Sequence, residues 1–347
     1  MKKIFASCLL SFSLLLSGCS TNAASQQATP VAANAAEPQS TQLFAMDTVM
    51  TLNAYGDDAQ TALDAASAEI TRLDALLSIS SDEGDIKPLN ENKTGEVSDD
   101  TAALLSRAME VATSTDGAFD FTIAPIMDAW GFSTQNYRVP SAEELLTLLT
   151  KVDYHQVSLS GNTVTLANDA KLDLGGIAKG FTSDRVMQVF ADNGVSSGII
   201  SLGGNVQALG CKPDGSPWRV AIQDPTNPEE NFAILEVTDK AVITSGGYQR
   251  YFDQDGVRYH HIIDPQTGYP AHNGLISATI ISADGTLADG LSTSLFVMGL
   301  DKASAYWQAH RDKFDAVLVT DDGTVYITEG LENVFTLENG STPEIIR

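Results

Sequence analysis

Short β-rich runs punctuated by glycine and Asp-Gly turns fill the second half of this chain, and they constrain its fold more than any other feature. The clearest runs are residues 163–166, 197–202, 218–222, 234–237 and 316–319. Two helical patterns interrupt them, one over about 177–192 and one beginning near Asp289. Strands and helices mix without strict βαβ alternation and without a repeat of fixed period. The pattern predicts an α/β protein of mixed α+β type, with mixed sheets flanked by helices in two intimate subdomains.

The first half of the folded part is predicted to be mainly helical. Residues 42–55 alternate as in a strand, and a helix follows that Asp57 or Asp58 can cap. A second helix is expected over about 101–115, and the capping box Ser141-x-x-Glu144 announces a third. An irregular loop lies between the second and third helices.

The N-terminus is predicted to be an export signal. Lys2 and Lys3 precede an apolar run over 4–16, too short for a comfortable membrane span, and the run closes on Ser17-Gly18-Cys19. This ending resembles the bacterial lipobox, whose cysteine is lipidated after cleavage; the alternative is an ordinary signal peptide with a chance cysteine. We expect a signal peptide over 1–18, lipidated Cys19 with a flexible tether over 19–41, and a folded domain over 42–340.

These segments predict an exported protein that is lipid-anchored to a membrane, either periplasmic or on the outer face of a cytoplasmic membrane. Cys8 would leave with the signal and Cys19 would be acylated, so only Cys211 of the three cysteines would remain. No internal disulfide is then expected.

The charge balance excludes one class of partner. The chain has 45 acidic and 20 basic residues, a formal net charge of -25. Such a surface does not hold a polyanion by general electrostatics, so nucleic acid is not expected as a partner. A small phosphorylated ligand would need local donors or a metal ion.

A strand running into a tight turn carries the first candidate for chemistry, in the stretch 260–270. Asp264, Pro265 and Gly268 fit the requirements of the turn, but the turn alone does not require His261 or Thr267. Taken alone, the stretch also fits a surface hairpin with a satisfied histidine.

Three further clusters carry possible chemistry. In Asp173-Leu174-Gly175-Gly176-Ile177-Ala178-Lys179-Gly180 a strand end passes through two glycines into a helix, whose N-terminus and lysine favour an anion. A second glycine pair, Gly246-Gly247, follows a β-rich run and would open room for a flat ligand; a β-bulge explains the pair equally well. Asp289 and Thr293 lie four residues apart on a helix, a pair of hard oxygens suited to Mg²⁺. The alternative is that Asp289 caps that helix and Thr293 packs on its first turn.

Together and in this order, the motifs resemble the ApbE family of FAD:protein FMN transferases over about residues 43–335. The matching stretches include 116–120, 173–180, 245–248, 261–270 and 288–293. Met46-Asp47-Thr48 stands where the family has Met-Gly-Thr. If 42–55 is one strand, Asp47 is expected to face away from Met46.

The resemblance implies an ApbE-like layered fold and a Mg²⁺-dependent enzyme. It would transfer FMN from FAD to a threonine or serine hydroxyl of an exported flavoprotein, such as a membrane redox-complex subunit, and release AMP. His261 and Asp289 would be catalytic. The carbonyl of Gly176 would hold Mg²⁺ with Asp289 and Thr293. The FAD site would be lined by Met46, Ala118, Phe119, Asp120, Asp173, Lys179 and Ile263.

Three other functions remain open from the residues. A member of the same fold can hydrolyse FAD to FMN and AMP with water in place of the protein hydroxyl. A flavin-binding lipoprotein would need neither the metal pair nor His261. An unrelated solute-binding lipoprotein would be expected to show two βαβ lobes, and that alternation is absent.

Overall fold

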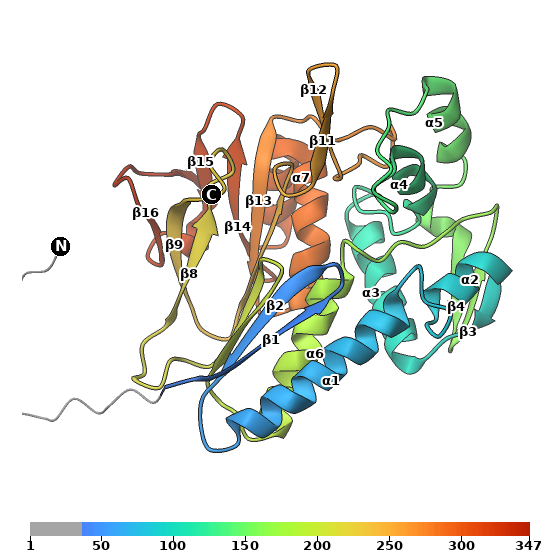
Figure 1. The fold of residues 1–347 in the computed structure, drawn as a ribbon. Helices are drawn as coiled ribbons and strands as arrows, with labels where there is room; N and C mark the ends of the chain where they lie inside the picture. Colours follow the sequence, from blue (N-terminus) through green and yellow to red (C-terminus); the bar gives the residue numbers. More distant parts are fainter. Residues whose placement is uncertain (1–36) are drawn as a thin grey trace, which may run out of the picture. The chain divides into compact units, whose positions relative to one another are not determined.

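A nine-stranded sheet runs through the part of the chain that the computed structural model describes, residues 37–347 (Figure 1). All neighbouring strands are antiparallel except the last pair, which is parallel. In spatial order the strands are β1 Gln39–Ala45, β2 Thr48–Ala54, β6 Gly198–Leu202, β7 Asn205–Leu209, β10 Ala241–Gly246, β13 Leu275–Ser282, β14 Asp315–Thr320, β15 Val325–Thr328 and β17 Glu344–Ile346. The mixed sheet predicted from the sequence is confirmed.

Three helices cover one face of this sheet: α1 (Ala59–Leu77), α6 (Ala178–Asp192) and α7 (Gly285–Ala309) (Figure 1). The strands alternate between the two faces. In β10, Ala241 and Ile243 pack into the core beneath the helices, whereas Val242 between them packs on the opposite face. Both faces of the central strands are therefore buried, and their sequences read as continuous apolar runs.

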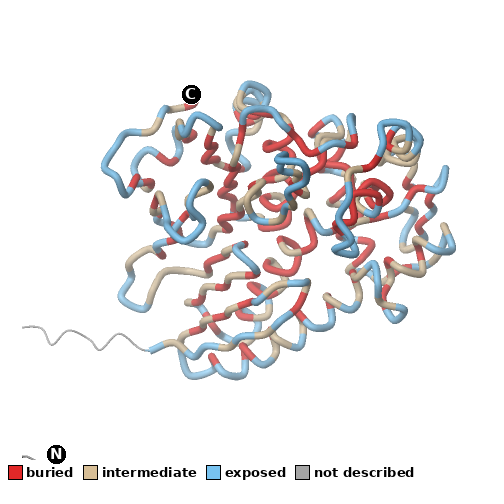
Figure 2. The backbone as a smooth tube through the Cα atoms, turned by 45° about the horizontal axis from the view of Figure 1, so that its top comes forward, coloured by how far each residue is buried: buried red, intermediate tan, exposed pale blue. Residues whose placement is uncertain are grey.

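A second, three-stranded sheet covers the opposite face. It consists of β16 (Phe335–Leu337), β9 (Asn231–Val237) and β8 (Trp218–Gln223). Trp218 and the other inward residues of this sheet share one apolar cluster with the central strands. Figure 2 shows the buried backbone concentrated between these layers.

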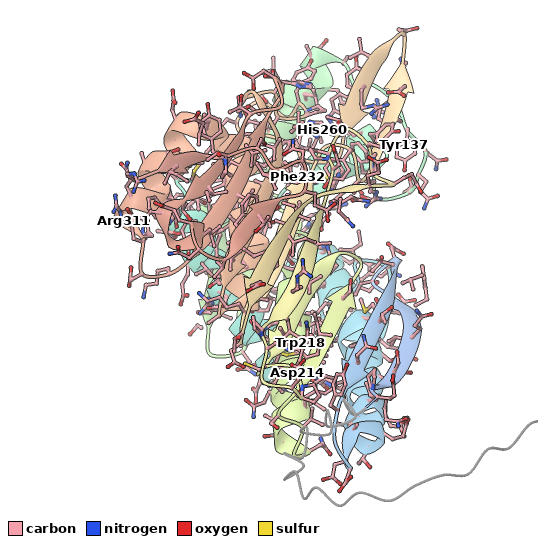
Figure 3. The ribbon with its side chains drawn as sticks, turned by 90° about the vertical axis from the view of Figure 1, so that its left-hand side faces the viewer. Tyr137, Asp214, Trp218, Phe232, His260 and Arg311 are labelled. Carbon is pink, nitrogen blue, oxygen red and sulfur yellow. The ribbon has the colours of Figure 1, made fainter. Side chains whose placement is uncertain are left out.

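Shorter elements lie beside the helical layer. They are α2 Ile86–Asn92, β3 Thr94–Glu96, α3 Asp99–Ser114, α4 Ala124–Trp130, α5 Ala142–Leu149, η1 Tyr154–Gln156, β4 Val157–Ser160 and β5 Thr163–Leu166. The short η2 (Glu329–Leu331) lies on the other side of the main sheet, where Leu331 packs with the three-stranded sheet. The hairpin of β11 (Tyr251–Gln254) and β12 (Val257–His260) packs its aromatic side chains against Trp130 and Phe132. Figure 3 places His260 and Tyr137 at one end of the molecule and Trp218 and Asp214 at the other.

The predicted cap of α5 is confirmed in part. Ser141 Oγ accepts a hydrogen bond from the Glu144 N–H at 3.2 Å. The Glu144 carboxylate binds Arg138 and does not complete the capping box.

The single strand predicted over 42–55 is wrong, because the segment is the hairpin of β1 and β2. Its turn is Met46-Asp47, with φ angles of 48° and 58°. The expectation that Asp47 faces away from Met46 by strand alternation fails with it. Because both turn residues have positive φ angles, the glycine that the family motif has at position 47 suits this turn. Aspartate, which this chain has instead, tolerates the left-handed region better than most other side chains.

The predicted start of the helix near Asp289 is also wrong. α7 begins at Gly285, and its N-cap is Asp284, whose Oδ1 accepts the Leu287 N–H at 2.8 Å. Asp289 therefore lies past the first turn and does not cap α7. The helix is kinked at Gly299, which has φ 76° and ψ 171°. The short helices α2 and α4 were not predicted.

The predicted signal peptide, Cys19 and most of the tether lie outside the described residues. β1 begins at Gln39, inside the segment predicted to be tether. Within residues 37–347, no helix has both the length and the hydrophobicity that a membrane span requires. Cys211 is free.

Candidate active site

The candidate site is built where α6 begins against the second turn of α7. The backbone N–H of Gly180 donates to Asp289 Oδ2 at 2.8 Å. A Cβ at Gly180 would lie 2.6 Å from Asp289 Cβ and 2.2 Å from the Gly285 carbonyl oxygen. Only glycine permits this approach of the two helices, which explains the glycine that ends the 173–180 motif.

Asp289 is buried, and each of its carboxylate oxygens accepts one hydrogen bond from a neutral donor. Its Oδ1 accepts from Asn205 Nδ2 at 3.0 Å, and its Oδ2 accepts from Gly180 in the first turn of α6. The α6 N-cap residue, Ile177, has no capping side chain, so Asp289 satisfies one of the free amides of α6 from another helix. The positive end of α6 also favours a carboxylate here.

Thr293 lies one turn further along α7 and faces the glycine loop. A Cβ at Gly176 would lie 3.6 Å from Thr293 Oγ1 and 3.1 Å from the Phe119 ring. Thr293 Oγ1 is also 3.3 Å from Ser245 Oγ at the end of β10. The structure therefore brings Gly176, Thr293 and Phe119, three of the predicted site residues, close together.

The oxygens at this crossing suit a small hard cation. A carboxylate, a hydroxyl and a backbone carbonyl of the 173–180 loop are ligand types that Mg²⁺ accepts, usually with water and substrate phosphates completing the shell. Asp289 uses one acceptor position on each oxygen for its present donors, so lone pairs remain on both. Within the described residues there is no group of three or more His, Cys, Asp or Glu side chains that could hold a metal.

The geometry around His261 fixes its tautomer. His261 follows β12, and the Arg250 carbonyl oxygen accepts from its backbone N–H at 3.0 Å and from ring Nδ1 at 3.1 Å. A carbonyl only accepts, so Nδ1 must carry the proton and the lone pair of the neutral ring must be on Nε2. Burial, together with the charge of Arg250, lowers the pKa of His261 to about 3. The ring is therefore a neutral base at physiological pH.

The same two cations act on this histidine and on one carboxylate of the 173–180 loop. The charges of Arg250 and Lys179 both act on His261 and on Asp173. Burial raises the pKa of Asp173, and its Oδ1 accepts the Gly175 N–H at 2.8 Å. The predicted residues His261, Lys179 and Asp173 therefore form one electrostatic neighbourhood.

The end of β10 connects Thr293 to the histidines. Ser245 contacts Thr293, while a Cβ at Gly247 would lie 2.8 Å from His260 Cδ2. Gly247 lets the backbone pass beside the His260 ring, whereas a Cβ at Gly246 would lie 2.2 Å from the Tyr248 ring. The β10–β13 register is unbroken through Gly246, so the structure shows no β-bulge there.

Met46 approaches the site from the β1–β2 turn. Its N–H donates to Asp74 Oδ1 of α1 at 3.0 Å, and its Sδ lies 3.7 Å from Thr182 Oγ1 of α6. The strained turn is thus held against the first turns of α6, where a planar ligand could contact the thioether.

Both carboxylate oxygens of Asp120 accept hydrogen bonds from neighbouring segments of the protein. Its Oδ1 accepts from the N–H and the hydroxyl of Thr122 at 2.8 and 2.6 Å, and its Oδ2 accepts from the Tyr154 N–H at 2.9 Å. Burial raises its pKa. Its visible role is to hold the 115–123 loop against η1, which positions Ala118 and Phe119.

Ile263 is not gathered with the other predicted side chains. It is buried in a separate apolar cluster with Ile126, Trp130, Phe132 and Leu145. Its side chain therefore supports the turn that follows His261.

Sequence reasoning missed two residues of the site, Asn205 and Arg250. Asn205 follows a Gly-Gly turn that resembles any hairpin connection, so no sequence signal pointed to it. Arg250 lies two residues after the 245–248 stretch, where the glycines drew the interpretation.

A surface recess of about 440 Å³ lies elsewhere and shares no residue with the predicted site. Its charged lining residues are Lys93, Asp128, Arg138, Glu144, Lys151, Asp169 and Lys171. Arg138 pairs with Glu144 and Lys151 lies 3.7 Å from Asp169, so much of its charge is compensated.

The fold and site define a mixed α/β protein in which carboxylate and hydroxyl oxygens lie where α6 crosses α7, next to a neutral histidine. The ApbE family model matches residues 46–318. An FAD:protein FMN transferase of Vibrio cholerae is 34% identical over 267 residues, covering 73% of this chain and 80% of the relative. One of Treponema pallidum is 37% identical over 246 residues, covering 66% and 68%.

Solved structures agree with these matches. The ApbE protein of Thermotoga maritima superposes with a TM-score of 0.81 at 33% identity, covering 86% of this chain and 99% of that one. The flavin transferase ApbE of Vibrio cholerae gives a TM-score of 0.77 at 28% identity, covering 86% and 99%. The chain belongs to the ApbE family.

Proposed function

We propose that this protein transfers FMN from FAD to a threonine or serine hydroxyl of an exported flavoprotein and releases AMP. The observation that carries the proposal is the meeting of Gly176, Asp289 and Thr293 at one helix crossing, next to the neighbourhood of His261. The names of the relatives support flavin transfer.

The transfer exchanges the phosphoanhydride bond of FAD for a phosphoester bond to the acceptor. The acceptor hydroxyl oxygen bonds to the phosphorus of the FMN half, the bond from that phosphorus to the AMP oxygen breaks, and AMP leaves with that oxygen. The hydroxyl proton goes to His261 Nε2, which is free to accept it because Nδ1–H is bound to the Arg250 carbonyl.

The chain supplies positioning and charge for this step. Lys179 lies in the first turn of α6, whose N-terminus favours phosphate oxygens. The residue set at the crossing fits Mg²⁺, which when bound would neutralise charge on the pyrophosphate. Asp289, Thr293 and the Gly176 carbonyl would hold it. Met46 and Phe119 offer apolar surface for the flavin.

We further propose that the protein is exported and anchored through a lipid on Cys19. The support is the signal and lipobox pattern of residues 2–19. Labelled palmitate should enter the wild-type protein and not the Cys19→Ala variant. Equal labelling of both would exclude Cys19 as the anchor.

The transferase test uses purified protein, FAD, Mg²⁺ and an acceptor flavoprotein domain, with intact masses and AMP recorded. A mass gain of one FMN on the acceptor, accompanied by AMP, is expected. AMP and free FMN without labelling would favour the FAD hydrolase, and binding of FAD without turnover would favour a flavin-binding lipoprotein.

A further inference from the structure

Arg250 occupies a position in the site that is explained neither by the family motifs nor by the contacts proposed for the flavin. It lies directly before β11, and His261 lies directly after β12, so the two residues face each other at the base of the hairpin. The Arg250 carbonyl accepts both the backbone and the ring N–H of His261, at 3.0 and 3.1 Å. The orientation of the ring therefore depends on where this one carbonyl is held.

The side chain of the same residue holds that carbonyl in place. Its Nη2 donates to the backbone carbonyl of Phe132, and its guanidinium carbon lies 5.9 Å from the centre of the Phe132 ring. Phe132 is fully buried and packs against Phe252 of β11. Arg250 thus links the ring of His261 to the rigid segment after α4.

We propose that Arg250 is the positioning residue of His261, which fixes the ring through its carbonyl and anchors that carbonyl through its guanidinium. This inference rests on the proposed function, because it assigns His261 as the proton acceptor. Arg250 is not assigned a contact with substrate.

The charge of the guanidinium acts in the same direction as the hydrogen bond. The groups whose charges act on His261 are Arg250, Lys179 and His260, and burial of the ring adds to them. All disfavour the protonated ring. Removing Arg250 should therefore loosen the tautomer and make protonation easier, whereas a structural role alone would change neither.

The test compares Arg250→Met, Arg250→Lys and Arg258→Met in the full chain. Arg250→Met keeps the stem but removes the charge and the donor, and Arg250→Lys keeps the charge without the planar fork. Arg258 is the matched control, since it is an exposed arginine of the same hairpin that pairs with Asp253.

The ring of His261 is read directly by ¹H–¹⁵N correlation spectra, with its signals assigned from the spectrum of His261→Gln. Wild type should show the Nδ1–H tautomer. Arg250→Met should show a mixture of tautomers and a higher titration midpoint, and Arg250→Lys a mixture with a smaller shift. An unchanged tautomer and midpoint in Arg250→Met would overturn the proposal.

Kinetics supply the second readout. Arg250→Met should lower kcat about 10- to 100-fold, as losses of supporting partners commonly do, with little change in the KM for FAD. Arg258→Met should keep the wild-type kcat; an equal loss there would mean that the hairpin as a whole was destabilised and would overturn the specific role. If wild type transfers no FMN, the proposed function fails, while the ring spectra still decide whether Arg250 positions His261.

Discussion

Asp289 on α7 accepts a hydrogen bond from the backbone N–H of Gly180 on α6, with 2.8 Å between Oδ2 and N. The carboxylate of Asp289, which belongs to α7, therefore accepts a free amide of the first turn of α6 and also faces the position proposed for Mg²⁺. Its structural and chemical roles can be separated by experiment, because a second aspartate of the same helix has only a structural role.

Asp289→Ala should abolish FMN transfer and also lower stability. Loss of the only carboxylate proposed for the metal should reduce transfer by about 100-fold or more, and loss of the α6 contact should lower the free energy of unfolding by about 1 kcal/mol. Transfer rate and urea unfolding measure the two effects. Asp284→Ala, which removes the N-cap of α7, is the control. It should cost similar stability and retain transfer; loss of transfer in both variants would remove the case for a metal role.

Thr293→Val should weaken the binding of Mg²⁺ without unfolding the protein. Valine keeps the shape of threonine but lacks the hydroxyl that lies near Gly176. The Mg²⁺ concentration that gives half-maximal transfer should rise about 10- to 100-fold. Thr293→Ser restores the hydroxyl and should return the midpoint close to wild type. Equal midpoints for the valine variant and wild type would exclude Thr293 as a ligand.

The buried His260 and the partly buried His261 should make the fold sensitive to acid. The pKa of His260 is lowered to about 4 and that of His261 to about 3, chiefly by burial. The unfolded chain therefore binds more protons than the folded chain between the ordinary histidine pKa of about 6.5 and these values. The contribution of these two histidines to the free energy of unfolding should be fully present above about pH 6.5 and should be lost as the pH drops through this window.

His261→Gln should flatten this acid dependence. Urea unfolding at a series of pH values between 7 and 4 measures the slope, because glutamine has no proton to take up on unfolding. His155→Gln, at an exposed histidine, is the control for the loss of one imidazole. The same slope in wild type and His261→Gln would show that the ring is not held neutral.

Asp120→Asn tests whether that residue holds a loop or touches FAD. An asparagine can offer its oxygen to Thr122 or to Tyr154, but its NH₂ then faces another N–H or O–H donor. Leaving a buried donor unpaired should lower the free energy of unfolding by about 1 to 3 kcal/mol. Calorimetric binding of FAD at low temperature, where the variant stays folded, should remain close to wild type. A large loss of FAD affinity in the folded variant would instead support a direct contact between Asp120 and FAD.

The layered fold was predictable because its signals are local. Strands such as 163–166 and the helix over 177–192 carry their own periodicity and turns. The start of α7 was not predictable, because Asp284 and Asp289 are both plausible caps. Tertiary contacts decide between them, since Asp184 of α6 accepts the N–H groups of Gly285 and Thr286 and so fixes where α7 begins. The β1–β2 turn was missed because Met46-Asp47 lacks the glycine that usually marks such a turn.

The site was predictable only where its residues belong to dense motifs. Gly176, Asp289 and Thr293 belong to such stretches and meet in the structure. Asn205 and Arg250 act through a few hydrogen bonds to other segments of the chain, and such bonds leave no periodic trace in a sequence. Ile263 lies beside His261 in the chain, but its side chain points into a different core, a distinction that only packing determines.

Gly180→Ala sets local propensity against packing. Alanine in a helix is favoured over glycine by about 1 kcal/mol, so propensity alone predicts a more stable α6. The new Cβ would lie 2.2 Å from the Gly285 carbonyl oxygen and 2.6 Å from Asp289 Cβ. Both are rigid parts of α7, so the helices must separate, and overpacking of this kind costs about 1 to 3 kcal/mol. We expect a net loss of stability and, because Asp289 is displaced from Gly180, a loss of transfer. Gly95→Ala is the control, since a Cβ there meets no atom within 4 Å. A Gly180→Ala variant more stable than wild type, with full transfer, would show that the crossing is loose enough to adapt and that the close approach of the two helices does not set the geometry of the site.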